Sequence, residues 1–123
     1  MLFLGLDIGT QGVRGLVVDD RGQVISENGS AFTTLNLSKI ELHSEQSAFV
    51  WIEALKDVLQ HCMFELKEAG FVSEDIAGIG VDGTSGTILP LSSDFQPVTN
   101  ALMYNDARSS KEAEQVQTAG EEL

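Results

Sequence analysis

The sequence predicts an α/β fold, built on a mixed sheet that combines an antiparallel three-stranded meander with a parallel crossover strand and flanking helices. Three observations predict it. Two turn signals near the start separate three β-rich runs, one long stretch has the apolar spacing of a helix, and a further apolar run follows that helix. Two hairpins in succession make three strands antiparallel, and a return through a helix makes the next strand parallel.

The first strands are predicted from β-rich runs that turn residues interrupt. Glycine favours turns because it adopts positive φ, and aspartate does so because its side chain accepts local amides. The runs are Leu2–Leu6, Val13–Val18 and Gln23–Ser26, and the turns between them are Gly9–Gly12 and Asp19–Gly22. We therefore expect two consecutive hairpins.

A loop and a long helix are expected next. The stretch Ala31–Gln46 is polar and irregular, which predicts a loop. Ser47 is a suitable N-cap because its hydroxyl can accept a free amide of the first helical turn. Apolar residues then alternate spacings of four and three, which places them on one face of a helix of about six turns. They are Ala48, Ile52, Leu55, Leu59, Cys62, Leu66 and Ala69. Gly70 stands where a left-handed C-cap is expected.

The elements predicted after the helix are shorter. We expect Ile76–Val81 to be a buried strand reached by the crossover, and Gly83–Gly86 to be a tight polar loop at its end. The remaining elements are a strand at Thr87–Leu91, a turn at Ser92–Pro97, an extended segment at Leu102–Tyr104 and a helix from Ser109 onward. Because this last helix completes no apolar stripe, we expect the chain to be the front part of a longer protein.

The charge balance is strongly acidic. The 123 residues include 7 Lys and Arg against 19 Asp and Glu, for a formal net charge of -12. Binding a nucleic-acid backbone requires clustered basic side chains, and an anionic membrane surface would repel an acidic chain, so the composition argues against nucleic-acid and membrane partners. The apolar run Met1–Leu6 is too short for a secretory leader, and no stretch reaches the roughly 18 apolar residues of a membrane span. We therefore expect a cytoplasmic protein.

Three features could suggest a disulfide, a metal site or a dinucleotide site, but each has a simpler explanation. The single cysteine, Cys62, excludes an internal disulfide and lies on the apolar stripe of the helix, as a core residue does. His43 and His61 have no partners at metal-ligand spacing. Gly78–Gly83 matches the dinucleotide fingerprint, but its glycines lie inside a predicted strand and no helix follows.

The strongest chemical motif lies at the first turn, Leu4-Gly5-Leu6-Asp7-Ile8-Gly9-Thr10-Gln11-Gly12-Val13-Arg14. Asp7 ends a buried strand, where a lone carboxylate is costly and a hydrated metal ion would stabilise it. Glycines let backbone amides approach an anion closely, and Thr10 and Gln11 add side-chain donors. Together these features suit a nucleotide phosphate with Mg²⁺. The alternative is an ordinary β-turn whose aspartate caps its own amides.

These residues resemble a known family. Asp-Ile-Gly-Thr before an antiparallel strand resembles the first phosphate motif of the actin-like ATPase superfamily, and the continuation Thr-Gln-Gly-Val-Arg is similar to the FGGY carbohydrate kinases. Two later segments agree with that family: Ile79-Gly80-Val81-Asp82-Gly83-Thr84-Ser85-Gly86-Thr87 and Ala101-Leu102-Met103-Tyr104-Asn105-Asp106-Ala107-Arg108. Ser44-Glu45-Gln46 also fits. The resemblance implies that residues 1–123 form the N-terminal part of the first of two RNase H-like lobes, with the second lobe absent.

The resemblance implies a reaction. FGGY kinases transfer the γ-phosphoryl group of ATP to a hydroxyl of a sugar or polyol. By resemblance, Asp7 positions Mg²⁺ and the phosphate, and the turn contacts ATP through Gly9, Thr10, Gln11 and Gly12. The catalytic base, an aspartate of a later motif, lies outside this chain. We therefore expect the full-length protein to be a kinase and the 123-residue chain alone to be inactive.

The resemblance also implies a sugar site. Its residues are Asp82, Ser85, Gly86, Tyr104 and Asp106. Ser85-Gly86 stands where xylulokinases carry Met-His and glycerol kinases Arg-Glu, and the Gly-Thr-Ser pattern is closer to a ribulokinase-like branch. We therefore expect a ketopentose such as D-ribulose or D-xylulose. Alternatives remain open: Ser85 as a turn residue, Tyr104 as a core residue, and Asp106 with Arg108 as a structural ion pair.

Two other functions share some of these features. An actin-like or chaperone-like ATPase has the first motif but gives no reason for the two later segments. A non-catalytic sugar-binding relative is the third possibility, and the presence or absence of the later aspartate motif, outside this chain, decides it. The partner expected from the resemblance is a small-molecule sugar, with a homodimer of the full-length protein as the macromolecular assembly to test.

Overall fold

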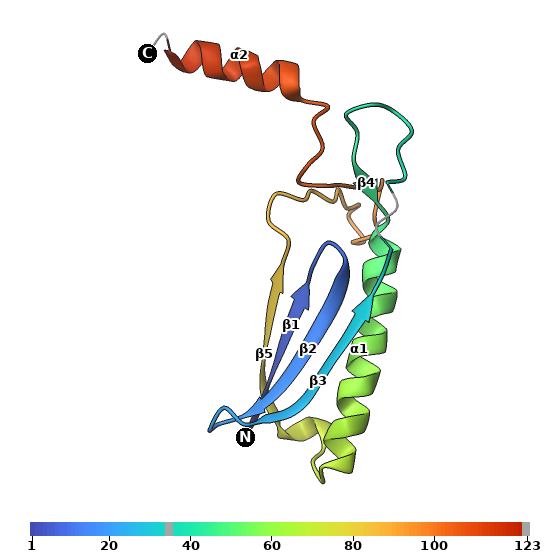
Figure 1. Ribbon diagram of the computed structural model, residues 1–123, viewed down its shortest axis with the longest axis vertical. Coiled ribbons are helices and arrows are strands. Elements are labelled where there is room, and N and C mark those ends of the chain that lie inside the picture. Colours follow the sequence, from blue (N-terminus) through green and yellow to red (C-terminus); the bar gives the residue numbers. More distant parts are fainter. Residues whose placement is uncertain (34–35, 122–123) are drawn as a thin grey trace. The chain divides into compact units, whose positions relative to one another are not determined.

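A computed structural model describes residues 1–33 and 36–121 of the chain (Figure 1). The residues divide into two compact units, which are described separately. The first unit contains Met1–Thr34 and Ala48–Ser85, and the second contains Leu35–Ser47 and Gly86–Leu123.

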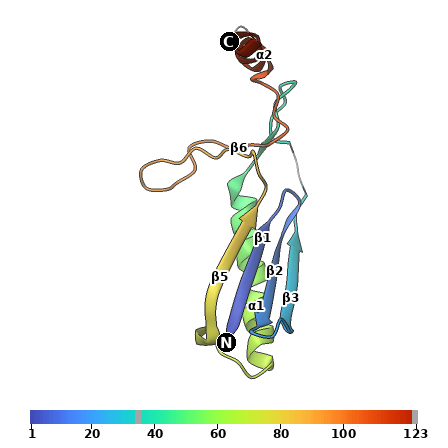
Figure 2. The same cartoon turned by 90° about the vertical axis from the view of Figure 1, so that its left-hand side faces the viewer.

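The first unit contains a four-stranded mixed sheet in the order β3-β2-β1-β5 (Figures 1 and 2). Its strands are β1 (Leu2–Ile8), β2 (Gly12–Asp19), β3 (Val24–Ala31) and β5 (Ile76–Gly83). Strand β2 pairs antiparallel with both β1 and β3, whereas β5 pairs parallel with β1. The predicted meander, crossover and fold class are therefore confirmed.

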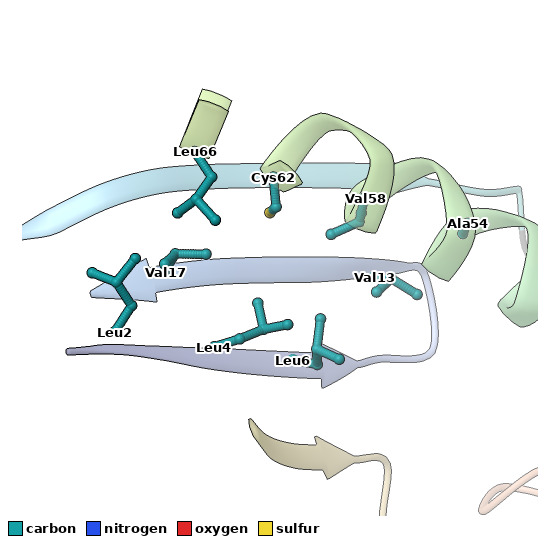
Figure 3. Close-up of a cluster of buried hydrophobic side chains, with 9 residues drawn as sticks. All are labelled: Leu2, Leu4, Leu6, Val13, Val17, Ala54, Val58, Cys62 and Leu66. Atoms are coloured by element: carbon teal, nitrogen blue, oxygen red, sulfur yellow. The ribbon is translucent and has the colours of Figure 1, made fainter. Parts of the chain in front are cut away.

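Helix α1 (Ala48–Glu68) covers one face of this sheet and packs against β2 and β3. Figure 3 shows the core, where alternate side chains of β1 and β2 meet four side chains of the helix. Gly15 of β2 makes this contact close: a Cβ there would lie 2.6 Å from Val58 Cγ1 and 3.1 Å from Cys62 Sγ. Cys62 is fully buried, as predicted.

The predicted face of the helix is correct in part. Its buried residues are Ala48, Ala54, Val58, Cys62 and Leu66, with Leu55 and Leu59 at the edge of the core. Ile52 is 47% exposed and Ala69 is also exposed. The buried line Ala54, Val58, Cys62 and Leu66 advances in steps of four and therefore winds slowly around the helix, because one turn takes about 3.6 residues; it shares only Cys62 and Leu66 with the predicted stripe. Gly70 ends the helix at φ +85°, as predicted.

The expectation that residues 76–81 form a buried strand is wrong on burial. Strand β5 forms after the 3₁₀ turn Ser73–Asp75, but Ile79 and Val81 are 64% and 66% exposed. They pair in register with Leu4 and Leu6, which are buried. The difference arises because α1 packs over β2 and β3 and leaves β5, the last strand of the sheet, uncovered.

The second unit has little regular structure. Its strands are β4 (Glu45–Gln46) and β6 (Ala101–Leu102), which pair antiparallel. The expected loop at residues 31–46 thus contains the end of β3 and all of β4; positions 34 and 35 of it lie outside the described residues. Helix α2 (Ser110–Glu121) confirms the last predicted helix. No helix within residues 1–33 and 36–121 is long and apolar enough to cross a membrane.

The strand expected at residues 87–91 does not form. Only isolated bridges occur there, Ile88 to Leu102 and Leu91 to Pro97. Pro90 lies between them and lacks the amide hydrogen that a continuous ladder needs. The turn predicted after it is present, closed by the Ser92 amide donating to the Gln96 carbonyl at 2.9 Å.

Candidate functional site

The turn between β1 and β2 is built from close backbone approaches. The Gly9 amide donates to the Gly12 carbonyl at 2.9 Å, and the Phe32 amide donates to the Gln11 carbonyl at 3.0 Å. A Cβ on Gly12 would lie 2.8 Å from the Ser30 carbonyl oxygen, so only glycine fits where β2 begins beside the end of β3. The turn predicted from its glycines is confirmed.

Three charged residues lie in a row across the sheet beside this turn. Asp7 of β1 is in register with Asp82 of β5 on one side and with Arg14 of β2 on the other. Arg14 Nη1 donates to Asp7 Oδ2 at 3.4 Å, and both side chains are accessible, 82% and 48% exposed. The self-capping considered for Asp7 is found instead at Asp82, whose Oδ1 accepts the Gly83 amide at 2.7 Å.

The charged row borders a groove of about 810 Å³. Glycines from all four strands of the sheet line it, so backbone is accessible there, and Leu16 adds an apolar wall. The lining residues are Gly5, Leu6, Asp7, Arg14, Gly15, Leu16, Glu27, Asn28, Gly29, Gly80, Val81 and Asp82. The groove thus combines exposed backbone with carboxylates and one guanidinium group. Such a surface can receive a polar ligand that carries negative charge through a metal ion.

A second contact joins the turn to the loop after β5. Thr10 Oγ1 and Thr84 Oγ1 lie 3.1 Å apart, and the Thr84 amide donates to the Ile8 carbonyl at 3.3 Å. The structure therefore brings the first motif and the start of the second motif together at the carboxyl ends of β1 and β5, where α/β sheets place ligands. Ser85 follows in this unit and is exposed.

Two residues of this site were not singled out from the sequence. Arg14 was quoted as the end of a motif, yet counting outward from the hairpin turn pairs it with Asp7 and could have identified it. Thr84 carried no comparable signal, because its contact with Thr10 depends on the parallel register between distant segments.

The second unit carries the other predicted sugar-site residues. Gly86 has φ +77°, and a Cβ there would lie 3.4 Å from Tyr104 Cβ, so these two residues are neighbours. Tyr104 is 60% exposed. Its ring is thus accessible to a ligand, and the core-packing alternative considered for Tyr104 is not supported by this exposure.

The ion-pair alternative for Asp106 and Arg108 is confirmed. Arg108 Nε and Nη2 donate to the two oxygens of Asp106, each at 2.8 Å, and Nη2 also donates to Glu45 Oε1 at 2.7 Å. These bonds hold the pKa of the Asp106 carboxyl well below its usual range and raise the pKa of the Arg108 guanidinium. Arg108 and Asn100 likewise lower the pKa of Glu45. All three groups are therefore charged at neutral pH.

The donor set in the first unit fits a hydrated Mg²⁺ ion. Mg²⁺ is usually bound in proteins by one or two carboxylates, with water and phosphate oxygens completing its shell. Asp7 and Asp82 offer two carboxylates in register, and both line the groove. No group of three or more His, Cys, Asp or Glu residues in the described part of the chain could hold a metal by itself.

Comparisons with known proteins agree on one family. A profile described as the FGGY family of carbohydrate kinases, N-terminal domain, matches residues 2–122. The xylulose kinase of Lactococcus lactis is 30% identical over 113 residues, which are 92% of this chain and 22% of that protein. The ribulokinase of Halalkalibacterium halodurans is 29% identical over 113 residues, which are 84% of this chain and 20% of that protein.

A solved structure shows the same fold. The crystal structure of xylulose kinase from Rhodospirillum rubrum matches with a TM-score of 0.82 at 19% identity, over 96% of this chain and 24% of that one. This chain therefore spans less than a quarter of each of these three proteins.

Proposed function

The chain belongs to the FGGY family of carbohydrate kinases, and from this we propose that its full-length protein is an ATP-dependent kinase that phosphorylates a hydroxyl of a ketopentose such as D-ribulose or D-xylulose. One observation carries the proposal: Asp7 lies in register with Asp82 and Arg14 beside a glycine turn. A carboxylate and a guanidinium group beside a glycine turn suit phosphoryl transfer, which depends on positioning and on electrostatic stabilisation of charge. A cytoplasmic location and a homodimer belong to the same proposal.

Residues of the first turn bind the nucleotide in this proposal. Gly9 and Gly12 shape the turn so that its backbone can approach the terminal phosphate, and the side chains of Thr10 and Gln11 contact that phosphate, because oriented N–H and O–H donors stabilise phosphate oxygens. Asp7 holds Mg²⁺, which neutralises charge on the phosphates when bound. Arg14 adds a cation next to Asp7. The base that accepts the proton of the sugar hydroxyl comes from outside this chain.

Contacts with the sugar are proposed for the loop after β5 in the first unit and, separately, for the segment around Tyr104 in the second. Small residues in this loop leave room for a five-carbon sugar, and Asp82 and Ser85 offer acceptors and a donor. Gly86 and Tyr104, which are neighbours, offer an accessible aromatic ring. Asp106 contributes to the sugar site indirectly. Its two oxygens already accept four hydrogen bonds, and through these bonds it holds the segment that carries Tyr104.

ADP release by the full-length protein tests the function. The assay uses ATP and Mg²⁺ with D-ribulose, D-xylulose, glycerol or no sugar, and we expect turnover only with a pentulose. Turnover without sugar would assign the protein to the actin-like or chaperone-like ATPases, and an absence of turnover under all conditions would leave a non-catalytic sugar-binding protein. The 123-residue chain alone is expected to be inactive, because transfer requires both substrates to be positioned together.

Substitution of Asp7 tests the role of the charged row. Asp7→Asn in the full-length protein keeps the side-chain shape and removes the charge, so we expect turnover to fall by at least about 100-fold while folding survives. Asp20→Asn is the matched control, because Asp20 is an exposed turn residue of the same unit. Near-normal turnover of Asp7→Asn would contradict the assignment.

A further inference from the structure

The Glu45 carboxylate links the two ends of the segment 100–108, which carries Tyr104. Glu45 Oε1 accepts a hydrogen bond from Arg108 Nη2 at 2.7 Å, and Glu45 Oε2 accepts one from Asn100 Nδ2 at 3.1 Å. Asn100 and Arg108 flank the segment on its two sides, and Tyr104 lies midway between them. A single side chain from another part of the sequence therefore ties both ends of the segment.

The far end of the segment is fixed a second time. Asp106 accepts from Nε and Nη2 of Arg108, and its Oδ2 also accepts the Ser44 amide at 2.7 Å. Arg108 thus divides its planar fork between two carboxylates, an arrangement that fixes orientation better than a single point charge does. The side chains of Asp106 and Glu45 are only 7% and 21% exposed, so water competes weakly for these bonds.

The backbone supplies the rest of the frame. Strand β6 pairs with β4 on one side, and Ile88 bridges Leu102 through two hydrogen bonds of 2.9 and 2.8 Å. Gly86 and Tyr104, which are each two residues away from that bridge, lie next to each other. The Met103 amide donates to the Ser44 carbonyl at 2.9 Å. The backbone on both sides of Tyr104 is therefore held, although the residue is 60% exposed.

The segment that carries Tyr104 is fixed although Tyr104 itself is exposed, so its order has a cause other than burial of this residue. The burial of the Tyr104 ring does not fix this segment, since most of the ring is accessible. Ion pairs and hydrogen bonds fix it instead, and among them the Glu45 carboxylate is the group that bonds to both Asn100 and Arg108. Holding a contact residue in place before the ligand arrives lowers the entropy lost on binding.

We propose that Glu45 is a positioning residue, whose carboxylate ties Asn100 to Arg108 and so presents Tyr104 to the sugar in a fixed place. The inference rests on the proposed function, because it takes Tyr104 as a sugar contact. It adds a role for a residue that touches neither the sugar nor the nucleotide in that proposal. Loss of this tie leaves the segment to be ordered by the sugar itself, so the sugar binds more weakly while ATP binding is unaffected.

The test compares Glu45→Gln with Glu41→Gln in the full-length protein. Glutamine keeps one acceptor but turns an NH₂ group toward the second donor, whereas Glu41 is exposed and controls for the lost charge. We expect the KM for the pentulose to rise roughly 3- to 30-fold in Glu45→Gln, with the KM for ATP within about 2-fold of the parent. Glu41→Gln should match the parent in both values.

A milder variant decides the case if Glu45→Gln does not fold. Asn100→Ala removes one arm of the tie and leaves the Arg108 pair in place, so we expect the same selective rise in sugar KM at a smaller size. An unchanged sugar KM in the folded variants, or an equal rise in the KM values for sugar and ATP, would overturn the positioning role. A parent protein without sugar-dependent turnover would instead overturn the proposed function itself.

Discussion

Each of the two units of the chain is stabilised internally by a different kind of interaction. In the first, a line of apolar residues on α1 packs on alternate residues of β1 and β2, and a small polar group of Ser26, Asn28 and Glu65 lies beside it. In the second, two-residue strands are joined by ion pairs and hydrogen bonds that meet at Arg108. The comparison teaches that apolar periodicity accounts for the first unit, whereas specific pairs of charged residues account for the second.

The largest expected effect tests the apolar contribution to the first unit. Leu66 is 1% exposed at the end of the core line, so Leu66→Ala should lower the free energy of unfolding by about 2–5 kcal/mol. Phe64, on the same helix, is 63% exposed, and Phe64→Ala should change the free energy of unfolding by less than about 0.5 kcal/mol. Urea unfolding of the chain measures both. Equal effects would show that α1 does not pack by this face.

An intermediate effect tests how closely the helix approaches the sheet. Gly15→Ala places a methyl group 2.6 Å from Val58 Cγ1, which should lower the free energy of unfolding by about 1–3 kcal/mol. Gly80 is also a strand glycine, but a Cβ at this position would meet no atom within 4 Å. Gly80→Ala is therefore the matched control and should be close to neutral. A neutral Gly15→Ala would mean a looser contact between α1 and β2 than the structure has.

The smallest effect concerns the ion pairs of the second unit and depends on pH. The pKa of Glu45 is lowered in the folded protein, so its stabilisation is fully present above an unfolded pKa of about 4.3 and is lost as pH falls through the folded pKa. The difference in Tm between the parent and Glu45→Gln should therefore be largest above about pH 5 and shrink toward pH 3.

A surface pair provides the control for that pH dependence. Lys56 and Glu53 form an ion pair 2.8 Å long on α1, but their side chains are 61% and 73% exposed. Lys56→Ala should therefore shift the Tm by no more than about 3 °C, since an exposed pair contributes at most about 0.5 kcal/mol. A pH-independent difference for Glu45→Gln would indicate that its contacts act by shape and not by charge.

Most of the fold could be predicted because local pattern determines it. Turn glycines and β-rich runs located the meander, and the crossover rule gave the parallel strand. Burial of β5 was the main error, because alternation of apolar residues cannot reveal whether a helix reaches that part of a sheet. The strand expected at residues 87–91 was lost to Pro90, whose missing amide outweighs the β-propensity of its neighbours.

The candidate site was predictable only where residues are close in sequence. Asp7 and the glycine turn form one continuous motif and needed no tertiary contact to be noticed. The contact between Thr10 and Thr84, and the tie from Glu45 to Asn100 and Arg108, join segments more than fifty residues apart. Such pairs depend on strand register and on side-chain geometry, which one sequence alone does not give.

The exposed strand β5 has a consequence for the behaviour of concentrated solutions. It ends the described sheet, and Ile79 and Val81 stand exposed along it. An apolar strand edge is a template for another copy, while a net charge of -12 keeps copies apart at low ionic strength. Salt at roughly 0.15 M shortens the screening length to about 8 Å. Added salt therefore weakens the charge repulsion between copies more than it weakens the apolar attraction between strand edges. We expect the colloidal stability of the chain to fall as ionic strength rises.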